Sequence, residues 1–525
     1  MSTLTLEEAV ANGMAIAYHA QQAPENMAVI SNYGNRTFAE LNERINQLAR
    51  VLRNAGLKPD DGVAMLLTNR PEFVEVLYAC QRTGLRVTPI NWHLTGDNAS
   101  YIVENSEAKA FIADIRCAAS AIDALNDNRA QVKLSLSVGG NIEGFGDYQD
   151  AVKDEASSNI EDPVIGTQML YTSGTTGRPK GVYRPRQAPD VRVNETVTRA
   201  QSAADWRPGE DLCLCTGPAY HAAPLAFNVN GPLVEGVGTV LMDKWDPEET
   251  LRLVQEHKVT HTHMVATMFH RLLALPEETR KKYDVSSLRY VVHGAAPCPV
   301  HVKHEMMEWL GPVVYEYYAA TEGGGGFFID PEAWLQKPGS VGSAPSADNR
   351  ILDDDGNELP TGEIGTIYFK APALRFEYYK DSEKTSGSYR GDYFTLGDMG
   401  YFDEDGYLFL TGRSAETIIS GGVNIYPQET DDVMLKHPAV ADVCTVGVPN
   451  DEWGEEVKSI VQVKPGVEHS VETAQMLIDF AREHLPGFKT PRTIDFIEDL
   501  PRLPSGKIQR RMVRAPYWAG RDKQI

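Results

Sequence analysis

The chain has 525 residues, of which 42% are hydrophobic and 23% charged, so it is long enough for two or three domains and has the composition of a water-soluble globular protein. Its formal net charge of -23 argues against nucleic acid or an anionic membrane as a partner held by general electrostatics, and a polyanionic ligand must meet a local basic site. The start carries no signal peptide, no apolar run approaches the roughly 20 residues of a membrane span, and the six cysteines are scattered, so we expect a reduced cytoplasmic protein with no transmembrane segment.

The N-terminal part of the chain alternates predicted helices and strands. Thr37 and Glu40 form a capping-box pattern, and the apolar residues after them recur at helical spacing as far as the stop signal at Gly56. An apolar strand is predicted over 62–67, and Pro71 opens the next helix. Further elements in this rhythm are a strand over 86–91, a helix over 246–257 and a strand over 259–265. The alternation predicts an α/β fold of mostly parallel sheets covered by helices.

The sequence changes character after about residue 410. An Asp-Gly pair at Asp405 predicts a hairpin, and residues 416–429 indicate a glycine-rich turn followed by a helix. Short strands and helices then alternate to the end of the chain. We therefore expect a large N-terminal domain over 1–411, built from helix-covered mixed or parallel sheets, and a small α+β domain over 412–525.

A loop rich in hydroxyls and glycines, YTSGTTGRPKGV, covers residues 171–182. The backbone N–H groups of such a loop can converge on phosphate oxygens, and Lys180 adds charge. After a strand over 167–172, we expect the loop at the carboxyl end of a parallel strand, on the way into a helix. It does not match G-x-x-x-x-G-K-[ST], which disfavours a motor or switch NTPase. A Thr/Ser-rich surface turn is the alternative. The candidate phosphate ligands are Thr172, Ser173, Gly174, Thr175, Thr176, Gly177 and Lys180.

Four further motifs follow this loop. GAAPCP begins at Gly294, YYAATEGG at Tyr317, TLGDMGYFDEDGYLFLTGR ends at Arg413, and LPSGKIQRR surrounds Lys507. None is specific alone, but with the loop they span more than 300 residues in order. By these motifs the chain resembles, over nearly its whole length, the adenylate-forming superfamily of acyl-CoA synthetases, adenylation domains and luciferases.

The resemblance implies a reaction in two steps. A carboxylic acid first attacks the α-phosphorus of ATP, which gives acyl-AMP and pyrophosphate; a thiol then attacks the acyl carbon, and AMP leaves. Both substrates of the first step are anions, so the site must hold them together and stabilise the charge that builds on phosphorus oxygens. ATP, Mg²⁺ and coenzyme A are therefore expected.

The resemblance also assigns roles to the motif residues. The loop with Lys180 would hold the β and γ phosphates. Thr321 would donate to the α-phosphate, Glu322 would bind Mg²⁺, and Lys507 would bridge the acyl carboxylate and the α-phosphate. The nucleoside would be held by Gly294, Ala295, Ala296, Pro297 and Tyr318 at adenine, and by Asp398 with Arg413 at the ribose. Each residue alone has an ordinary alternative as a solvated charge or a turn residue.

The second step would use a rotation of the small domain, which makes that domain mobile. Gly421 and Gly422 would then admit the pantetheine thiol, because glycines allow close backbone approach. Two positions depart from the family pattern. Ala415 stands where a hinge Asp or Lys is usual, with Glu416 next to it, and Ala319 stands where glycine is usual in the YYAATE motif.

The motifs specify the reaction more closely than they specify the acid substrate. Gly323 and Gly324 follow Glu322 and leave room for a bulky tail, while His221 and Phe227 are candidates for the acid pocket. Medium- or long-chain fatty acids are our first expectation. Aryl, arylalkanoic, cinnamate-like and steroid side-chain acids are the alternatives. For His221, a packed core histidine is the competing interpretation.

Other classes remain open at this point. A luciferase-like oxygenase would share every motif, a non-catalytic relative could bind nucleotide as a partner protein, and an ATP-driven switch would release ADP and phosphate. The presence of Glu322, Asp398 and Lys507 argues against the second. The expected partners are therefore small molecules, and the sequence leaves the oligomeric state open, a homodimer included.

Overall fold

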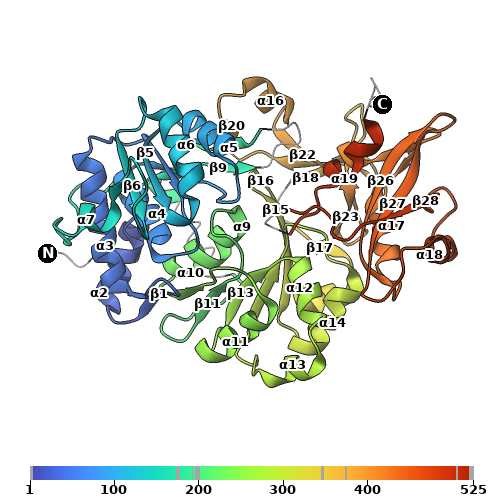
Figure 1. Cartoon of the computed structure of the whole chain (residues 1–525), viewed down its shortest axis with the longest axis horizontal. Coiled ribbons are helices and arrows are strands. Elements are labelled where there is room, and N and C mark those ends of the chain that lie inside the picture. Colours follow the sequence, from blue (N-terminus) through green and yellow to red (C-terminus); the bar gives the residue numbers. More distant parts are fainter. Residues whose placement is uncertain are drawn as a thin grey trace. The chain divides into compact units, whose positions relative to one another are not determined.

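The computed structural model describes residues 4–172, 178–191, 193–194, 202–344, 348–372, 375–503 and 506–519. Contacts divide the chain into two compact units, each built from separate stretches of sequence. Unit 1 comprises Met1–Met264, Ala274–Val292 and Ala371–Gly387, and unit 2 comprises Val265–Leu273, His293–Lys370 and Ser388–Ile525. Figure 1 labels the elements of both units.

Unit 1 contains a parallel six-stranded sheet in the order β7-β6-β5-β3-β4-β8. Its strands are β3 (Gly62–Leu66), β4 (Arg86–Pro89), β5 (Ala108–Asp114), β6 (Leu134–Val138), β7 (Gly146–Asp147) and β8 (Thr167–Gln168). Val63 and Met65 pack in one apolar cluster, and Ala64 and Leu66 pack in another, because successive strand residues point to opposite faces. Both faces are therefore buried, as the prediction of helix-covered parallel sheets requires.

Helices cover this sheet on both sides (Figure 1). They are α3 (Phe38–Asn54), α4 (Pro71–Thr83) and α7 (Tyr148–Val152) with the first cluster, and α5 (Gly96–Asn105) and α6 (Ala118–Asn128) with the second. The predicted capping box is present, since Thr37 N donates to Glu40 at 2.9 Å and Glu40 N donates to Thr37 at 3.2 Å. Pro71 is the first residue of α4, as predicted.

A second sheet of unit 1 runs in the order β14-β13-β11-β12-β1-β2. Its strands are β1 (Met27–Ser31), β2 (Arg36–Thr37), β11 (Leu212–Cys215), β12 (Gly238–Leu241), β13 (His261–Met264) and β14 (Tyr290–His293). The strands β13, β11, β12 and β1 are parallel, and β2 is antiparallel to β1. The remaining described helices of unit 1 are α1 (Leu6–Ala11), α2 (Ala15–Gln22), η1 (Ile115–Cys117), α9 (Ala222–Pro224), the π-helix η2 (Leu225–Asn230), α10 (Gly231–Val234), α11 (Pro247–His257), α13 (Glu277–Lys282) and α16 (Ser382–Gly387).

A small antiparallel sheet completes the strands of unit 1. It joins β9 (Leu170–Thr172), β10 (Lys180–Tyr183) and β20 (Glu377–Tyr378) in the order β20-β10-β9. The glycine-rich loop therefore connects two antiparallel strands. Our expectation of a loop that leads from a parallel strand into a helix was wrong, because residues on both sides of the loop pair with each other.

Unit 2 contains a β-hairpin and an antiparallel sheet. The hairpin consists of β15 (Val314–Ala320) and β16 (Gly323–Ile329). The sheet has the order β17-β23-β22-β19-β18, with β21 paired to β22. Its strands are β17 (Ser340–Gly342), β18 (Asn349–Leu352), β19 (Gly365–Lys370), β21 (Tyr389–Arg390), β22 (Tyr393–Phe402) and β23 (Leu408–Arg413). The helices here are α12 (Ala266–Leu273), α14 (Val300–Leu310) and α15 (Pro331–Gln336).

The C-terminal part of unit 2 has the α+β character that the sequence predicts. Its sheet comprises β24 (Ile418–Ser420), β25 (Val423–Ile425), β26 (Val440–Asn450), β27 (Gly454–Val463) and β28 (Thr493–Phe496). The helices are η3 (Ser414–Glu416), α17 (Pro427–Met434), α18 (Val471–His484) and α19 (Arg510–Trp518). Val443 of β26 packs with α17 and α18, and its neighbour Cys444 packs with α19, so both faces of the sheet are covered (Figure 1).

Two further predictions can be compared with the structure. All six cysteines are free thiols, which agrees with the absence of a disulfide framework. Within the described ranges, helices are too short or too polar to cross a membrane.

Candidate active site

The phosphate loop is described only at its two ends. Thr172 ends β9 and Lys180 begins β10, and these two residues are register partners across the hairpin. The Lys180 ammonium lies 5.6 Å from the centre of the Tyr378 ring in β20. Five of the predicted phosphate ligands lie outside the described residues, namely Ser173, Gly174, Thr175, Thr176 and Gly177. The hairpin thus places Lys180 opposite Thr172, where the loop begins and ends.

His221 and Phe227 lie on consecutive helical segments of unit 1. His221 caps α9, its Nε2 is buried without a hydrogen bond among the described residues, and its ring centre lies 4.4 Å from that of Tyr220. Burial lowers the pKa of His221 to about 4, and nearby His93 adds to the effect. The imidazole is therefore neutral near pH 7. Phe227 stacks on His263 at 5.4 Å from within the π-helix η2, a helix type frequent at functional sites.

The predicted adenine segment is a tight connection between β14 and α14. A Cβ atom on Gly294 would lie 2.6 Å from the carbonyl oxygen of Tyr317, so only glycine fits there. Ala295 has φ of 65°, a left-handed conformation that costs energy for a residue with a side chain. Ala296 and Pro297 continue the segment, which ends at Pro299, the residue before α14. Strain of this kind is common where backbone geometry serves a ligand.

Three predicted nucleotide ligands meet although they are far apart in sequence. Tyr318 Oη donates a 2.6 Å hydrogen bond to Asp398 Oδ2, and Arg413 Nε donates a 2.9 Å bond to Asp398 Oδ1. Burial raises the pKa of Tyr318, and the Asp398 charge adds to this, so the phenol keeps its proton. Burial alone would lower the pKa of Arg413, but Asp398 and Glu416 outweigh it and raise the pKa. The carboxylate of Asp398, 8% exposed, is held in one orientation.

Lys507 joins this group from the end of the chain. Its backbone carbonyl accepts from Leu503 N at 2.8 Å, and the preceding residue, Gly506, has φ of 85°. Burial lowers the pKa of Lys507; Arg413 lowers it further, while Glu416 and Asp398 oppose this. The lysine therefore lies close enough to the Asp398–Arg413 pair for these charges to act on it.

Thr321 and Glu322 form the tip of the hairpin between β15 and β16. Ala320 and Gly323 are register partners, which leaves a two-residue connection. Gly323 and Gly324 have φ of 105° and 117°, values that side chains rarely allow. Both tip residues are half-buried and project from this tight turn. Ala319, which replaces the usual glycine, is exposed at this end of β15.

The predicted thiol-admitting turn is a tight hairpin between β24 and β25. Gly421 and Gly422 have φ of 59° and 80°, as a type I′ turn requires. A Cβ on Gly421 would lie 2.5 Å from Trp453, whose carbonyl also accepts from Gly421 N at 2.8 Å. Trp453, 43% exposed, was missed by the sequence analysis because an isolated tryptophan on a polar stretch carries no pattern.

An ion-pair network missed by the sequence analysis fixes the segment after Arg413. Arg510 Nε lies 3.1 Å from Glu416 Oε2, and Arg510 Nη2 lies 2.8 Å from Asp431 Oδ2. Ala415 is exposed in the short helix η3. Glu416 thus connects the predicted hinge to the helix that follows Lys507.

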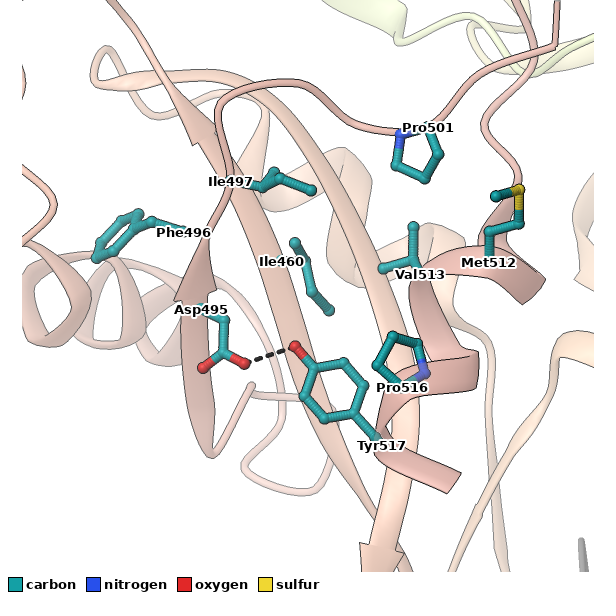
Figure 2. Close-up of a pocket in the computed structure, with 9 residues that line it drawn as sticks. All are labelled: Ile460, Asp495, Phe496, Ile497, Pro501, Met512, Val513, Pro516 and Tyr517. Carbon is teal, nitrogen blue, oxygen red and sulfur yellow. Dashed lines mark hydrogen bonds between the residues drawn. The ribbon is translucent and has the colours of Figure 1, made fainter. Parts of the chain in front are cut away.

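An apolar hollow of about 420 Å³ lies elsewhere in unit 2, among β27, β28 and α19. Figure 2 shows Ile460 and Val513 at its centre and the 2.5 Å hydrogen bond from Tyr517 to Asp495 at its side. None of the predicted site residues lines it, so this hollow is separate from the candidate active site.

Comparison with known proteins identifies the family. The model of the AMP-binding enzyme family matches residues 16–379, and that of the AMP-binding enzyme C-terminal domain matches residues 429–507. Similar proteins include a fatty acid–[acyl-carrier-protein] ligase, ScoC, of Streptomyces coeruleorubidus, 29% identical over 97% of each chain. A 2-succinylbenzoate–CoA ligase of Bacillus licheniformis is 31% identical over 94% of this chain and 97% of its own.

A solved structure agrees with these matches. ATP-bound MatB from Rhodopseudomonas palustris has a TM-score of 0.83 at 28% identity, over 97% of this chain and 99% of the other. The predicted family and the predicted α/β fold with a large N-terminal and a small C-terminal domain are confirmed. The chain therefore belongs to the AMP-binding enzyme family of the adenylate-forming superfamily, and it is an AMP-forming acid–thiol ligase that uses ATP, Mg²⁺ and coenzyme A.

Proposed function

We propose that the protein converts a medium- or long-chain fatty acid, or a similarly bulky hydrophobic acid, to its CoA thioester through acyl-AMP. The observation that carries the chemistry is the meeting of Tyr318, Asp398 and Arg413 with Lys507 close to them. These groups would hold the ribose and place a cation beside the α-phosphate. The feature that supports a bulky acid is the glycine run after Glu322, since Gly323 and Gly324 carry no side chain beside the proposed metal ligand.

The first half-reaction needs a cation between two anions. In this proposal Lys507 attracts the acyl carboxylate and the α-phosphate together, which lowers the cost of bringing like charges into contact. Thr321 donates to the α-phosphate from the hairpin tip, and Lys180 with the loop from Thr172 to Gly177 holds the β and γ phosphates. His221, neutral at pH 7, can offer one N–H to the acid without adding charge.

Mg²⁺ would be held mainly by substrate phosphate oxygens. The hard carboxylate oxygens of Glu322 fit this ion, and the residue lies at the tip of the two-residue turn between β15 and β16. The described residues contain no group of three or more His, Cys, Asp or Glu placed for a metal. When bound, Mg²⁺ neutralises charge on the phosphates of ATP.

In the second half-reaction, the small domain would supply the residues that admit the thiol. We place its boundary at residues 411 and 412, which fall between the two family matches, over 16–379 and 429–507. Gly421 and Gly422 would admit the thiol of coenzyme A along a backbone that carries no Cβ. A homodimeric state and a cytoplasmic location stay predictions.

An aryl or arylalkanoic acid is the second candidate substrate. Two observations favour it: Phe227 stacks on His263, and Trp92 packs edge-on against Tyr220 beside His221. Aromatic side chains of this kind can pack against a planar ring. The 2-succinylbenzoate–CoA ligase similarity points the same way.

The experiment is a substrate panel. Purified protein with ATP, Mg²⁺ and coenzyme A is given fatty, arylalkanoic, cinnamic and steroid side-chain acids, and pyrophosphate and acyl-CoA are measured. We expect both products with medium- or long-chain fatty acids. Turnover of aryl acids alone would overturn the first substrate in favour of the second. Pyrophosphate without thioester would contradict coenzyme A as the acceptor.

A further inference from the structure

Three charged or polar side chains meet inside unit 2, behind the adenine segment. Lys303 Nζ of α14 lies 2.7 Å from Glu316 Oε2 of β15, and His293 Nε2 at the end of β14 lies 3.3 Å from the same oxygen. Lys303 and His293 are 0% exposed and Glu316 is 7% exposed. These three residues lie outside the family motifs, and the proposed chemistry assigns no function to them.

The charge states of the three residues follow from their burial and proximity. Burial alone would raise the pKa of Glu316, but His293 and Lys303 outweigh it and lower the pKa to about 2, so the carboxyl is ionised. Burial lowers the pKa values of Lys303 and His293, and the Glu316 charge opposes it in both. Lys303 and Glu316 are therefore the charged pair, and the carboxylate of Glu316 also faces His293.

The surroundings of this group are dry. The Lys303 ammonium lies 4.5 Å from the centre of the Trp334 ring, and the His293 ring meets Phe269 edge-on at 5.1 Å. Both aromatic residues are buried. Neither ring nitrogen of His293 makes a hydrogen bond within the described part of the chain, so the 3.3 Å approach of Nε2 to Glu316 is a close contact and not a hydrogen bond. Such a pair gains little stability over a well-packed apolar group, because desolvation offsets the attraction. Its presence calls for another explanation.

The three residues sit on the three elements that bracket the adenine segment. His293 directly precedes Gly294, and Lys303 lies in the opening turns of α14, which follows the segment. Glu316 lies two positions before Tyr318, on the same face of β15. The segment itself is constrained, because a Cβ on Gly294 would collide with Tyr317 and Ala295 is held at φ of 65°. A strained backbone of this kind persists only when its surroundings hold it.

We propose that His293, Glu316 and Lys303 form a positioning unit, the buried triad, that sets the geometry of residues 294–297 and of Tyr318 for the adenine of ATP. The triad touches no substrate. It acts by fixing the end of β14, the start of α14 and β15 against one another through one shared carboxylate. This inference rests on the proposed role of residues 294–297 and deepens it.

The test compares one single variant with one paired variant. Glu316→Gln leaves the buried Lys303 without a counter-charge, so a loss of stability is expected in addition to the loss of nucleotide binding. Lys303→Met with Glu316→Gln removes both charges at similar volume, so its melting temperature should return toward that of the parent. His293→Phe, which keeps the ion pair, is the third variant.

The readouts separate positioning from stability. The Kd for AMP from calorimetric titration and the KM for ATP should both rise by roughly 10- to 100-fold in all three variants, a loss of about 1.4–2.8 kcal/mol of binding free energy. The KM values for acid and coenzyme A should stay unchanged. The paired variant is decisive, because a merely structural triad would recover AMP affinity together with stability.

Several results would overturn the proposal. One is parent-like AMP affinity in any folded variant, and another is a loss of folding in all three, which would make the triad a requirement of the fold. The Asp398→Asn variant tests the proposed nucleotide site separately from the proposed role of the buried triad. If it binds AMP like the parent, the proposed nucleotide site fails; if it binds weakly while the triad variants bind normally, only the triad proposal fails.

Discussion

Substitution of Asp398 by asparagine tests the nucleotide site with the least change in shape. In the parent, one carboxylate oxygen accepts from Tyr318 and the other from Arg413. An amide offers one acceptor and one donor, so it must turn an N–H toward one of these donors. The variant also loses the negative charge of the carboxylate whose oxygens would accept hydrogen bonds from the ribose hydroxyls. Hydrogen bonds to charged groups contribute about 1.5–3 kcal/mol, so the KM for ATP should rise roughly 10- to 150-fold.

The assay is ATP-dependent release of pyrophosphate at saturating acid, with calorimetric titration of AMP as an independent measure. The control is Asp405→Asn, which removes an exposed carboxylate beside Lys337 in the next turn. That variant should keep the parent KM. If Asp398→Asn only lowers the melting temperature and leaves the affinities for ATP and AMP unchanged, Asp398 is a structural residue and the site assignment is wrong.

Three further predictions concern the other groups of the site. Gly421→Ala should slow thioester formation from supplied acyl-AMP by roughly 10- to 100-fold and leave pyrophosphate release unchanged, because the new methyl would collide with Trp453 and the backbone has a positive φ. The matched control in the same assays is Gly466→Ala, which has a similar φ of 87° but no neighbouring atom for the methyl to meet. Burial and Arg413 lower the pKa of Lys507 from 10.5, so the lysine loses its charge, and kcat/KM for adenylation falls, as the pH rises through a value below 10.5. The pH profile of Lys507→Arg should lack this alkaline fall, because arginine keeps its charge. Glu322→Gln should raise the Mg²⁺ concentration needed for half-maximal adenylation, whereas exposed Glu332→Gln should not; equal titration curves would refute the metal role.

Much of the fold could be predicted because it depends on local chemistry. The Thr37–Glu40 capping box and the proline at the start of α4 are short-range patterns, and both are present in the structure. The pairing of β10 with β20 could not be predicted, since β20 lies almost two hundred residues further along the chain. Strand partners depend on long-range packing that a local pattern does not contain.

The candidate site shows the same division. Tyr318, Asp398, Arg413 and Lys507 could be named from motifs, but their hydrogen bonds could not. The left-handed backbone of Ala295 gives no signal in a sequence, because alanine rarely adopts this conformation and does not mark it as glycine would. The buried triad was missed for a related reason. A lysine, a glutamate and a histidine on three separate elements look like ordinary surface residues until the fold buries them together.

The central claim is that one lysine serves the first half-reaction and not the second. Lys507→Ala is therefore assayed twice, once for pyrophosphate release from ATP and acid, and once for thioester formation from supplied acyl-AMP and coenzyme A. Loss of one preorganised donor costs about 2.7–4 kcal/mol, so pyrophosphate release should fall 10²- to 10³-fold. Thioester formation should stay near the parent rate. An equal loss in both assays would contradict the role of Lys507 and the division of the reaction between two arrangements of the small domain.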